Sequence, residues 1–181
     1  MKKKPARRKA PAKKTAAPKK KVHFIPAGYH SVTPYLACRD AARAIDFYRK
    51  AFGAAELMRM PAPGGKIGHA EVKIGDSRVM LTDEYPEMNF LSPQARGGTS
   101  VHIHVYVKDV DAMAARAVAA GAKLIREVKD QFYGDRTGSI EDPFGHVWHL
   151  ATHKEEVSKA EMRKRSEKSM KEMQEMKESG G

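Results

Sequence analysis

The sequence predicts an α+β fold in which one β-α-β-β-β unit occurs twice. Asp40 and Asp109 lie 69 residues apart, and each precedes a stretch with helical spacing of apolar residues that ends in Gly-Ala. The same spacing pairs Leu81 with Leu150, in the segments expected to be the last strands of the two units. Two copies are too few for a solenoid, so we expect two modules closed around one shared cleft.

The first module is expected at about residues 29–84. Residues 32–38 alternate between apolar and polar as a strand does, and Asp40 then has the place of an N-cap. A helix follows and ends at Gly53, which supplies a C-terminal stop. Three further strands are predicted at residues 56–60, 67–74 and 78–83, with turn residues between them.

The second module is expected at about residues 99–153 and has the same order of elements. It consists of a strand at 100–107, a helix at 110–120 and strands at 123–128, 134–140 and 147–152. Residues 85–98 contain two prolines and a Gly-Gly pair, so they are predicted to be the linker that makes 22–153 one domain. Ser158 and Glu161 form a capping box, which predicts a charged C-terminal helix with a frayed end in residues 154–181.

The formal charge of +12 comes almost entirely from residues 1–21, which contain 11 Lys or Arg and no acid. This Lys/Pro/Ala-rich segment has no apolar surface to offset the entropy of ordering, so it is predicted to be a disordered tail. It resembles the tails of linker-histone-like proteins. It is interpreted either as a solubilising extension or as a sequence-independent binder of DNA, RNA or another polyanion through counterion release. The basic residues are Lys2, Lys3, Lys4, Arg7, Arg8, Lys9, Lys13, Lys14, Lys19, Lys20 and Lys21.

The composition excludes several other classes of protein. No run approaches 18 consecutive apolar residues, so a membrane span is not expected. Cys38 is the only cysteine, so no intrachain disulfide can form, and its apolar surroundings predict a buried thiol. The N-terminus has no apolar segment of the kind that secretory signals contain. A cytoplasmic protein is therefore expected.

Two long motifs carry a family resemblance. TPYLACRDAARAIDFYRKAFGA opens the first module and EDPFGHVW closes the second, and together they resemble the vicinal oxygen chelate superfamily. This superfamily includes glyoxalase I, extradiol dioxygenases, and fosfomycin and bleomycin resistance proteins. GGKIGHAEVKIGDSRVMLTDE and DQFYGDRTGSIEDPFGHVW are similar to its PhnB-like, or glyoxalase-like, branch. The resemblance extends over about residues 29–153 and implies an open barrel of two βαβββ modules around a cleft, and a homodimer.

The resemblance also implies where a divalent metal would bind. In metal-dependent members, the first and last strands of each module supply one ligand apiece, and the corresponding positions here are Thr33, Met80, His102 and His149. Only the two histidines bind metals well, with Zn, Ni, Mn or Fe as the candidate ions. Because Met80 and His149 stand where catalytic carboxylates would be, glyoxalase I and extradiol activities are not expected.

Side chains alternate between the two faces of a strand, and this alternation predicts further residues that face the cleft. His102, His104 and Tyr106 share one face of their strand, and His69 and Glu71 share one face of theirs. Glu71 is the candidate ligand or catalytic base, and His69 is a further candidate ligand. For His102 and His149, metal binding and simple hydrogen bonding both remain open at this point.

Arg136 is the candidate for orienting an anionic group of a substrate. The alternative is a structural ion pair with Asp135 or Glu141. Candidate substrate-binding residues also include His104 and the aromatic walls, which are Tyr35, Tyr106 and Phe132.

Three functional hypotheses follow. The first is a metal-dependent enzyme of the lyase or isomerase type that acts on a small oxygenated molecule. The second is a metal-free protein that binds and sequesters a small molecule, as bleomycin-resistance members do. The third is a protein that its basic tail tethers to a nucleic acid or another polyanion.

Overall fold

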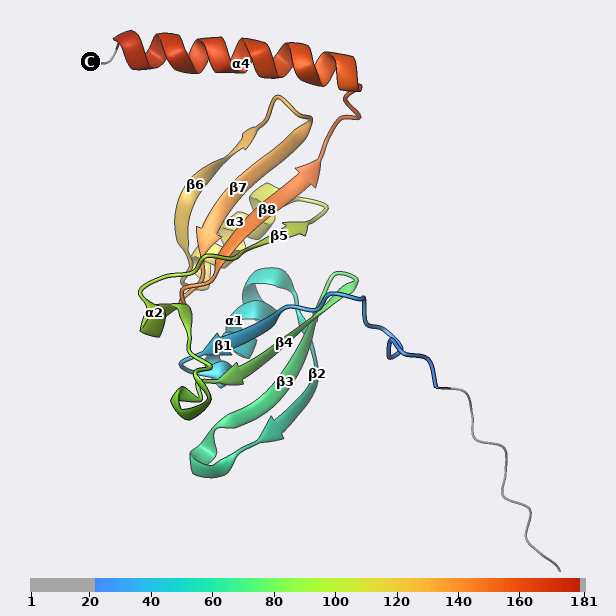
Figure 1. The fold of residues 1–181 in the computed structure, drawn as a ribbon, viewed down its shortest axis with the longest axis vertical. Coiled ribbons are helices and arrows are strands. Elements are labelled where there is room, and N and C mark those ends of the chain that lie inside the picture. Colours follow the sequence, from blue (N-terminus) through green and yellow to red (C-terminus); the bar gives the residue numbers. More distant parts are fainter. Residues whose placement is uncertain (1–21, 180–181) are drawn as a thin grey trace, which may run out of the picture.

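The protein contains two four-stranded sheets, each with one long helix on one face, as the computed structural model of residues 22–179 shows (Figure 1). The first module comprises β1 (Tyr35–Cys38), α1 (Ala41–Phe52), β2 (Ala55–Pro61), the short helix η1 (Pro63–Gly65), β3 (Ile67–Ile74) and β4 (Ser77–Asp83). The linker contains η2 (Pro86–Met88) and α2 (Pro93–Arg96). The second module comprises β5 (His102–Tyr106), α3 (Val110–Ala119), β6 (Lys123–Asp130), β7 (Asp135–Glu141) and β8 (Val147–His153), and α4 (Lys159–Ser179) follows it.

The two sheets have the same topology. Their strand orders are β1-β4-β3-β2 and β5-β8-β7-β6, and the first pair in each order is parallel while the others are antiparallel. Tyr35 pairs with Met80 in the first sheet, and His104 pairs with His149 in the second. The predicted repeat of 69 residues is therefore confirmed at these strands. The sheets stay open and separate instead of closing into a barrel.

The expected N-caps begin α1 and α3. Asp40 accepts a hydrogen bond from the backbone N–H of Arg43 at 2.9 Å, and Asp109 accepts one from that of Ala112 at 3.0 Å. Gly53 ends α1 with a φ of 65°, in the left-handed region that favours glycine. The first strand begins at Tyr35, later than the predicted residue 32, because Pro34 has no N–H to donate to a ladder.

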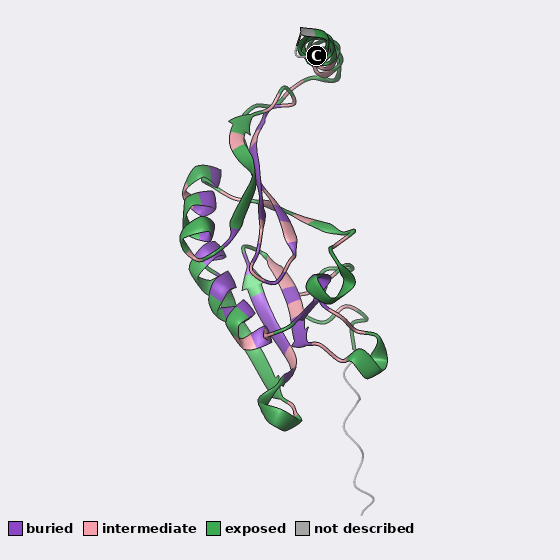
Figure 2. Ribbon diagram, turned by 90° about the vertical axis from the view of Figure 1, so that its left-hand side faces the viewer, coloured by how far each residue is buried: buried purple, intermediate pink, exposed green. Residues whose placement is uncertain are grey.

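Buried aromatic rings and one carboxylate join the two modules behind the sheets. The helices α1 and α3 lie side by side in one layer (Figure 2). Asp142, from the turn before β8, accepts hydrogen bonds through Oδ2 from Tyr48 Oη at 2.8 Å and Trp148 Nε1 at 3.0 Å. Its Oδ1 accepts from the backbone N–H groups of Phe144 and His146, both at 2.9 Å. Since Tyr48 belongs to α1, this carboxylate links the modules.

The other face of each sheet is open. No layer of described residues covers these faces (Figure 2), and every residue of β2 is exposed. Met58 and Met60, which pair with Glu71 and His69 across the ladder, are 38% and 53% exposed. Polar side chains on these faces differ in exposure, because Glu71 and Ser139 are buried whereas His102 and His104 are exposed.

The remaining segments lie outside the two sheets. The helix α4 projects from the end of the second module (Figure 1), and Arg165 holds its start through ion pairs with Glu155 at 2.8 Å and Glu161 at 2.9 Å. Cys38 is fully buried, as expected, and burial raises the pKa of its thiol. None of the helices within residues 22–179 is long and apolar enough to cross a membrane. The predicted basic tail, residues 1–21, lies outside the described residues.

Candidate functional site

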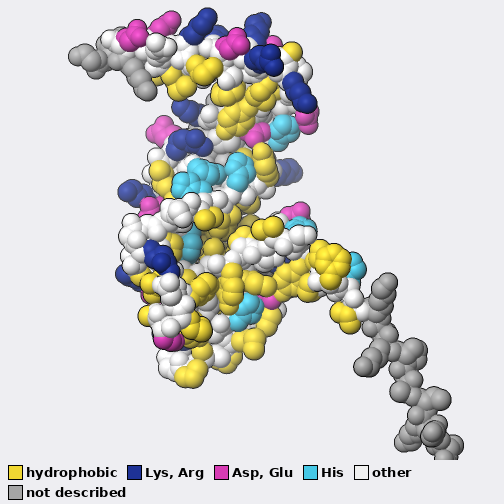
Figure 3. All heavy atoms as spheres, viewed as in Figure 1, with side chains coloured by type: hydrophobic (Ala, Val, Ile, Leu, Met, Phe, Trp, Pro, Cys, Tyr) yellow, Lys and Arg dark blue, Asp and Glu magenta, His cyan; other side chains and the backbone are white. Residues whose placement is uncertain are grey.

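Three histidines meet on the open face of the second sheet. His102 and His104 are two residues apart on β5, so their side chains lie on the same face, and His149 lies beside them on β8. His102 Nδ1 is 3.0 Å from His149 Nε2, and the ring centroids of His104 and His149 are 6.2 Å apart. Figure 3 shows imidazole side chains side by side on the surface of the second module. We refer to His102, His104 and His149 as the histidine cluster.

Ser139 extends this cluster into a hydrogen-bonded chain. Its hydroxyl oxygen lies 2.7 Å from His149 Nδ1, so both ring nitrogens of His149 have partners. Burial lowers the pKa of His149, and electrostatic interactions with His102, Arg126 and His104 lower it further. His149 is therefore a neutral imidazole near pH 7, the form that binds metals and accepts protons.

The donor side chains among residues 22–179 do not form a complete metal site. The other two positions implied by the family resemblance are Thr33 and Met80, which are poor ligands for a divalent ion. Within residues 22–179, no group of three or more His, Cys, Asp or Glu side chains is arranged to hold a metal. Catalytic zinc sites use three protein ligands, and the His102–His149 pair supplies two.

Glu71 is the centre of a different cluster, on the open face of the first sheet. Its Oε2 accepts a hydrogen bond from Arg78 Nη1 at 2.7 Å, and its Oε1 accepts one from the hydroxyl of Tyr29. His69 Nε2 lies 3.4 Å from the same Oε1, and His69 Nδ1 is 3.0 Å from the hydroxyl of Tyr35. We refer to these five residues as the glutamate cluster.

The partners of Glu71 determine its charge state. Burial alone would raise the pKa of Glu71, but hydrogen bonds from Tyr29, Arg78 and His69 outweigh burial and hold the pKa below its usual value. The same contact raises the pKa of Tyr29. Glu71 is therefore an ionised acceptor whose neighbours already occupy it. Among the described residues, no hydrogen bond or ion pair joins the glutamate cluster to His102 or His149.

Arg136 forms ion pairs, as the structural alternative expected, and its substrate-binding role stays a prediction. It forms a two-pronged ion pair with Asp111 on α3, with Nε–Oδ2 and Nη2–Oδ1 distances of 2.7 Å, and a third contact with Asp130 at 3.3 Å. Side chains alternate along β7, and Ser139 faces the histidines, so Arg136 lies on the helix face. Its ion-pair partners differ from the expected Asp135 and Glu141.

The predicted aromatic walls have different surroundings. Tyr106 donates a hydrogen bond to Asp135 Oδ2 at 2.9 Å, and His153 Nδ1 lies 2.7 Å from Asp135 Oδ1. The hydrogen bond to Asp135 raises the pKa of His153. Phe132 lies with α4 residues around a separate hollow, and it is not among the residues that line the groove between the modules.

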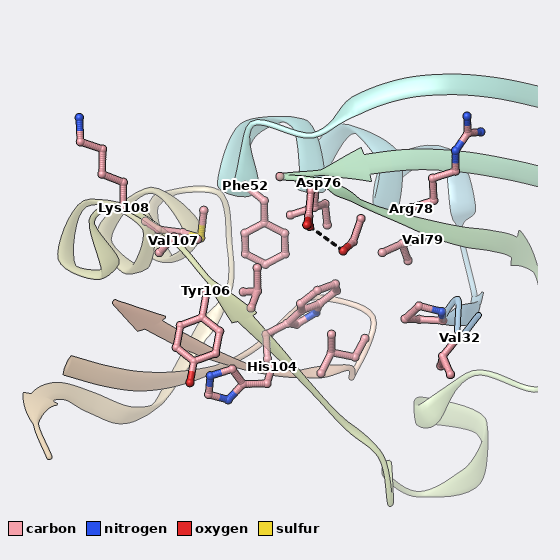
Figure 4. A pocket seen from close by; sticks show the side chains of 17 residues that line it. Val32, Phe52, Asp76, Arg78, Val79, His104, Tyr106, Val107 and Lys108 are labelled. Carbon is pink, nitrogen blue, oxygen red and sulfur yellow. Dashed lines mark hydrogen bonds between the residues drawn. The ribbon is translucent and has the colours of Figure 1, made fainter. Parts of the chain in front are cut away.

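A groove of about 800 Å³ lies between the modules (Figure 4). In Figure 4, Phe52 lies between the β3–β4 turn with Asp76 and the strand β5 with His104 and Tyr106. The walls are apolar, and they include Val32, Pro34, Phe52, Val79, Ile103 and Trp148. An adjoining hollow of about 560 Å³ shares Val32 and His104 with the groove and adds Tyr35 and His102. Four predicted site residues, Tyr35, His102, His104 and Tyr106, thus line the space between the halves.

Several residues of these clusters were not found from the sequence. Ser139 contacts the histidine cluster because it pairs with His149 across the β7–β8 ladder, and that register is not visible in one sequence. Tyr29 and Arg78 reach Glu71 from outside the strand that carries it. The only available signal was the Arg-Val-Met-Leu alternation of β4, which places Arg78 and Met80 on the same face.

Known proteins with similar sequences or structures identify the family. The model of the Glyoxalase/Bleomycin resistance protein/Dioxygenase superfamily matches residues 28–150. The uncharacterized protein Mb0911c of Mycobacterium bovis is 47% identical over 135 residues, which are 73% of this chain and 89% of that protein.

Two solved structures extend the comparison. TioX from Micromonospora sp. ML1 has a TM-score of 0.54 and 31% identity, over 71% of this chain and 100% of that one. A fosfomycin resistance protein, FosX from Listeria monocytogenes, was solved with Mn(II) and 1S,2S-dihydroxypropylphosphonic acid. It has a TM-score of 0.52 and 19% identity, over 65% of this chain and 85% of that one, so it shows the fold alone.

The paired βαβββ modules, the family model and the identity to these relatives agree. The chain belongs to the Glyoxalase/Bleomycin resistance protein/Dioxygenase superfamily.

Proposed function

We propose that this protein binds a small oxygenated organic molecule in the groove between its modules, without a resident metal. The observation that carries the proposal is the lining of the groove. Apolar side chains make up most of the lining of this groove of about 800 Å³, and its polar side chains are Asp76, Ser77, Arg78, His104, Tyr106 and Lys108. Small-molecule sites combine a volume of this size with a mostly apolar lining and a limited set of polar groups. The poor ligands at Thr33 and Met80 favour capture of a molecule over metal-dependent turnover.

The single tryptophan offers a direct test, because Trp148 is part of the groove lining. Chelator-treated protein is titrated with acetoin and with benzoin, two α-hydroxyketones that differ in apolar surface, and Trp148 fluorescence is followed. We expect saturable binding without metal, tighter for benzoin because the walls are apolar. Val32→Phe adds a ring at the groove and should weaken binding, whereas Val118→Phe, on the exposed surface of α3, should not.

A second candidate function is that of a metal-dependent enzyme of the lyase or isomerase type. It is favoured by the 3.0 Å separation of His102 Nδ1 and His149 Nε2, because two nitrogens bound to one Zn²⁺ lie about 3 Å apart. The Listeria protein, which has this fold, was solved with Mn(II). A complete site would need ligands from the bound molecule or from a second chain.

Metal content separates the two candidates. Untagged protein purified without chelator is offered Mn, Fe, Ni and Zn, and mass spectrometry compares it with the His102→Ala/His149→Ala variant. Near-stoichiometric metal that disappears in the variant, with ligand binding only in its presence, would replace the capture function with the metal-dependent one. Metal-independent binding in both proteins supports capture.

We also propose a homodimer, because the open sheet faces leave apolar side chains uncovered. Tyr35, Met58 and Met60 are 45%, 38% and 53% exposed on the first sheet. Burying such a surface against a second copy would stabilise an oligomer. Sedimentation equilibrium should give twice the chain mass, and Met58→Lys/Met60→Lys should shift the protein toward monomer. A wild-type protein that is monomeric at all concentrations tested contradicts this proposal.

The basic tail supports a third role, sequence-independent binding of a polyanion. Its 11 Lys or Arg residues are not balanced by any acid, and neutralising phosphates with such side chains releases counterions. Double-stranded DNA of two unrelated sequences should bind equally, and the affinity should fall steeply with salt. Deleting residues 2–21 should abolish binding, and binding that survives the deletion would assign it to another surface.

A further inference from the structure

The segment before β1 is attached to the first sheet through the side chain of Tyr29 and through backbone carbonyls that Arg78 contacts. Residues 22–32 form no helix or strand, and Val22, Phe24 and Val32 are 89%, 87% and 84% exposed. The segment runs past the β3–β4 turn (Figure 1). Arg78 donates hydrogen bonds to the carbonyls of Gly28 at 3.1 Å and Ala27 at 3.5 Å. Tyr29 itself is half-buried, whereas its neighbours Gly28 and His30 are exposed.

The contacts of Tyr29 are those of a bound phenol. Its ring lies against the guanidinium group of Arg78, with 4.4 Å between Arg78 Cζ and the ring centroid. Its hydroxyl donates to Glu71, which Arg78 also contacts at 2.7 Å. A flat cation and a carboxylate acceptor thus contact the two chemically distinct parts of a phenol, its π face and its O–H group.

We propose that Glu71, Arg78 and His69 form a binding subsite for a phenolic ligand, and that Tyr29 occupies it as an intramolecular stand-in. An ionised carboxylate accepts hydrogen bonds and cannot donate them, so the subsite selects neutral O–H groups over carboxylates. The subsite lies on the first sheet, and it goes beyond the proposed capture of a ligand in the groove.

The tether makes Tyr29 a strong competitor. A group on a short flexible linker has an effective concentration on the order of millimolar, so a free phenol must exceed about this concentration to displace it. Arg78 and Val32 also line the groove between the modules, so the subsite and the groove adjoin. A ligand that reaches both would gain contacts that Tyr29 does not make, and its binding would release residues 22–32.

The test uses p-cresol, which has the chemistry of the tyrosine side chain, as the probe for the full chain. Ligand-observed NMR titrations compare wild type with Tyr29→Ala, in which the subsite is vacated. We expect Tyr29→Ala to bind p-cresol at least tenfold more tightly than wild type. Toluene, which lacks the hydroxyl, should bind Tyr29→Ala at least fivefold more weakly than p-cresol. Adding Glu71→Gln to Tyr29→Ala should lower this preference for p-cresol at least threefold.

Two further variants are controls. Tyr133→Ala removes a tyrosine from the β6–β7 turn and should bind p-cresol as wild type does. Tyr29→Phe keeps the ring and loses the hydroxyl, so its affinity for p-cresol should lie between those of wild type and Tyr29→Ala, and circular dichroism checks each fold. Equal affinity in wild type and Tyr29→Ala, or equal affinity for p-cresol and toluene, would overturn the proposal. Neither result bears on benzoin binding in the groove, which Trp148 fluorescence reports separately.

Discussion

The two sheets share one strand order and pairing, but their open faces carry different polar side chains. Tyr35 of the first sheet corresponds to His104 of the second, and Met80 corresponds to His149. Glu71 pairs with Met80, and Ser139 pairs with His149, so Glu71 and Ser139 are also equivalent. The first face is thus an ionic cluster around a carboxylate, and the second is a hydrogen-bonded chain of a hydroxyl and imidazoles. The two modules share their strand pairing and differ in the side chains on their open faces.

The comparison also shows where the repeat changes its register. The spacing is 69 residues for β1 and β5 and for β4 and β8, but Glu71 and Ser139 are 68 apart. The two-residue turn between β3 and β4 is replaced by a longer turn that contains Asp142. Because side chains alternate along a strand, a shift of one residue exchanges the faces. A constant spacing of 69 would pair Ser139 with Ala70, which is buried on the helix face.

The largest expected effect concerns the residue that joins the modules. Asp142→Ala leaves the hydroxyl of Tyr48, the indole N–H of Trp148 and two backbone N–H groups without their acceptor. We expect a loss of about 3–5 kcal/mol in the free energy of unfolding, measured in urea. Asp76→Ala, at an exposed turn, is the control. An Asp142→Ala protein as stable as this control would show that the rings alone hold the modules together.

Substitutions on the ionic first face should lower the stability of the fold more than substitutions on the second face. Glu71→Gln weakens a buried charge-assisted contact, and we expect a loss of about 1–3 kcal/mol, whereas Ser139→Ala removes one hydrogen bond to His149 and should cost about 1 kcal/mol. Urea denaturation of both variants measures the difference. A larger loss for Ser139→Ala would reverse the assignment of the two faces.

The pH dependence separates the faces further. The pKa of His149 is lowered in the folded protein, so its stabilising contribution is complete above the unfolded value of about 6.5 and is lost as the pH falls through the folded pKa. The pKa of Glu71 is also lowered, but the pH range in which its contribution to stability is lost lies lower, below the ordinary pKa of a glutamate. Between about pH 5 and 8, His149→Gln should therefore flatten the loss of stability on acidification, as urea unfolding measures, and Glu71→Gln should not. Parallel pH profiles for wild type and His149→Gln would contradict this.

The smallest effect is expected at Arg136. Its ion pairs with Asp111 and Asp130 lie on the helix side and are exposed to solvent. Arg136→Ala should lower the melting temperature only slightly and leave benzoin binding unchanged in the Trp148 fluorescence titration. Weaker binding in this variant would support the predicted substrate-binding role of Arg136.

The sequence was informative about the elements and less so about the sites. The N-caps at Asp40 and Asp109 and the alternation on β3 and β5 are local properties, so both helices and all the strands were predictable. The same alternation placed His102 and His104 on one face. Ser139 was not predictable, because its contact depends on the ladder register. The pairing of Arg136 with Asp111 was not predictable either, because it requires α3 to lie over β7.

The sequence by itself determined the repeat, the α+β class and the family, because these depend on patterns within short segments. Only the tertiary structure decided which polar groups meet. It enclosed Glu71 between Arg78 and Tyr29 and gave His149 a serine and a histidine as partners. The physical reason is that a hydrogen bond requires two groups within about 3 Å, and for residues far apart in the chain only packing and register bring them to that distance.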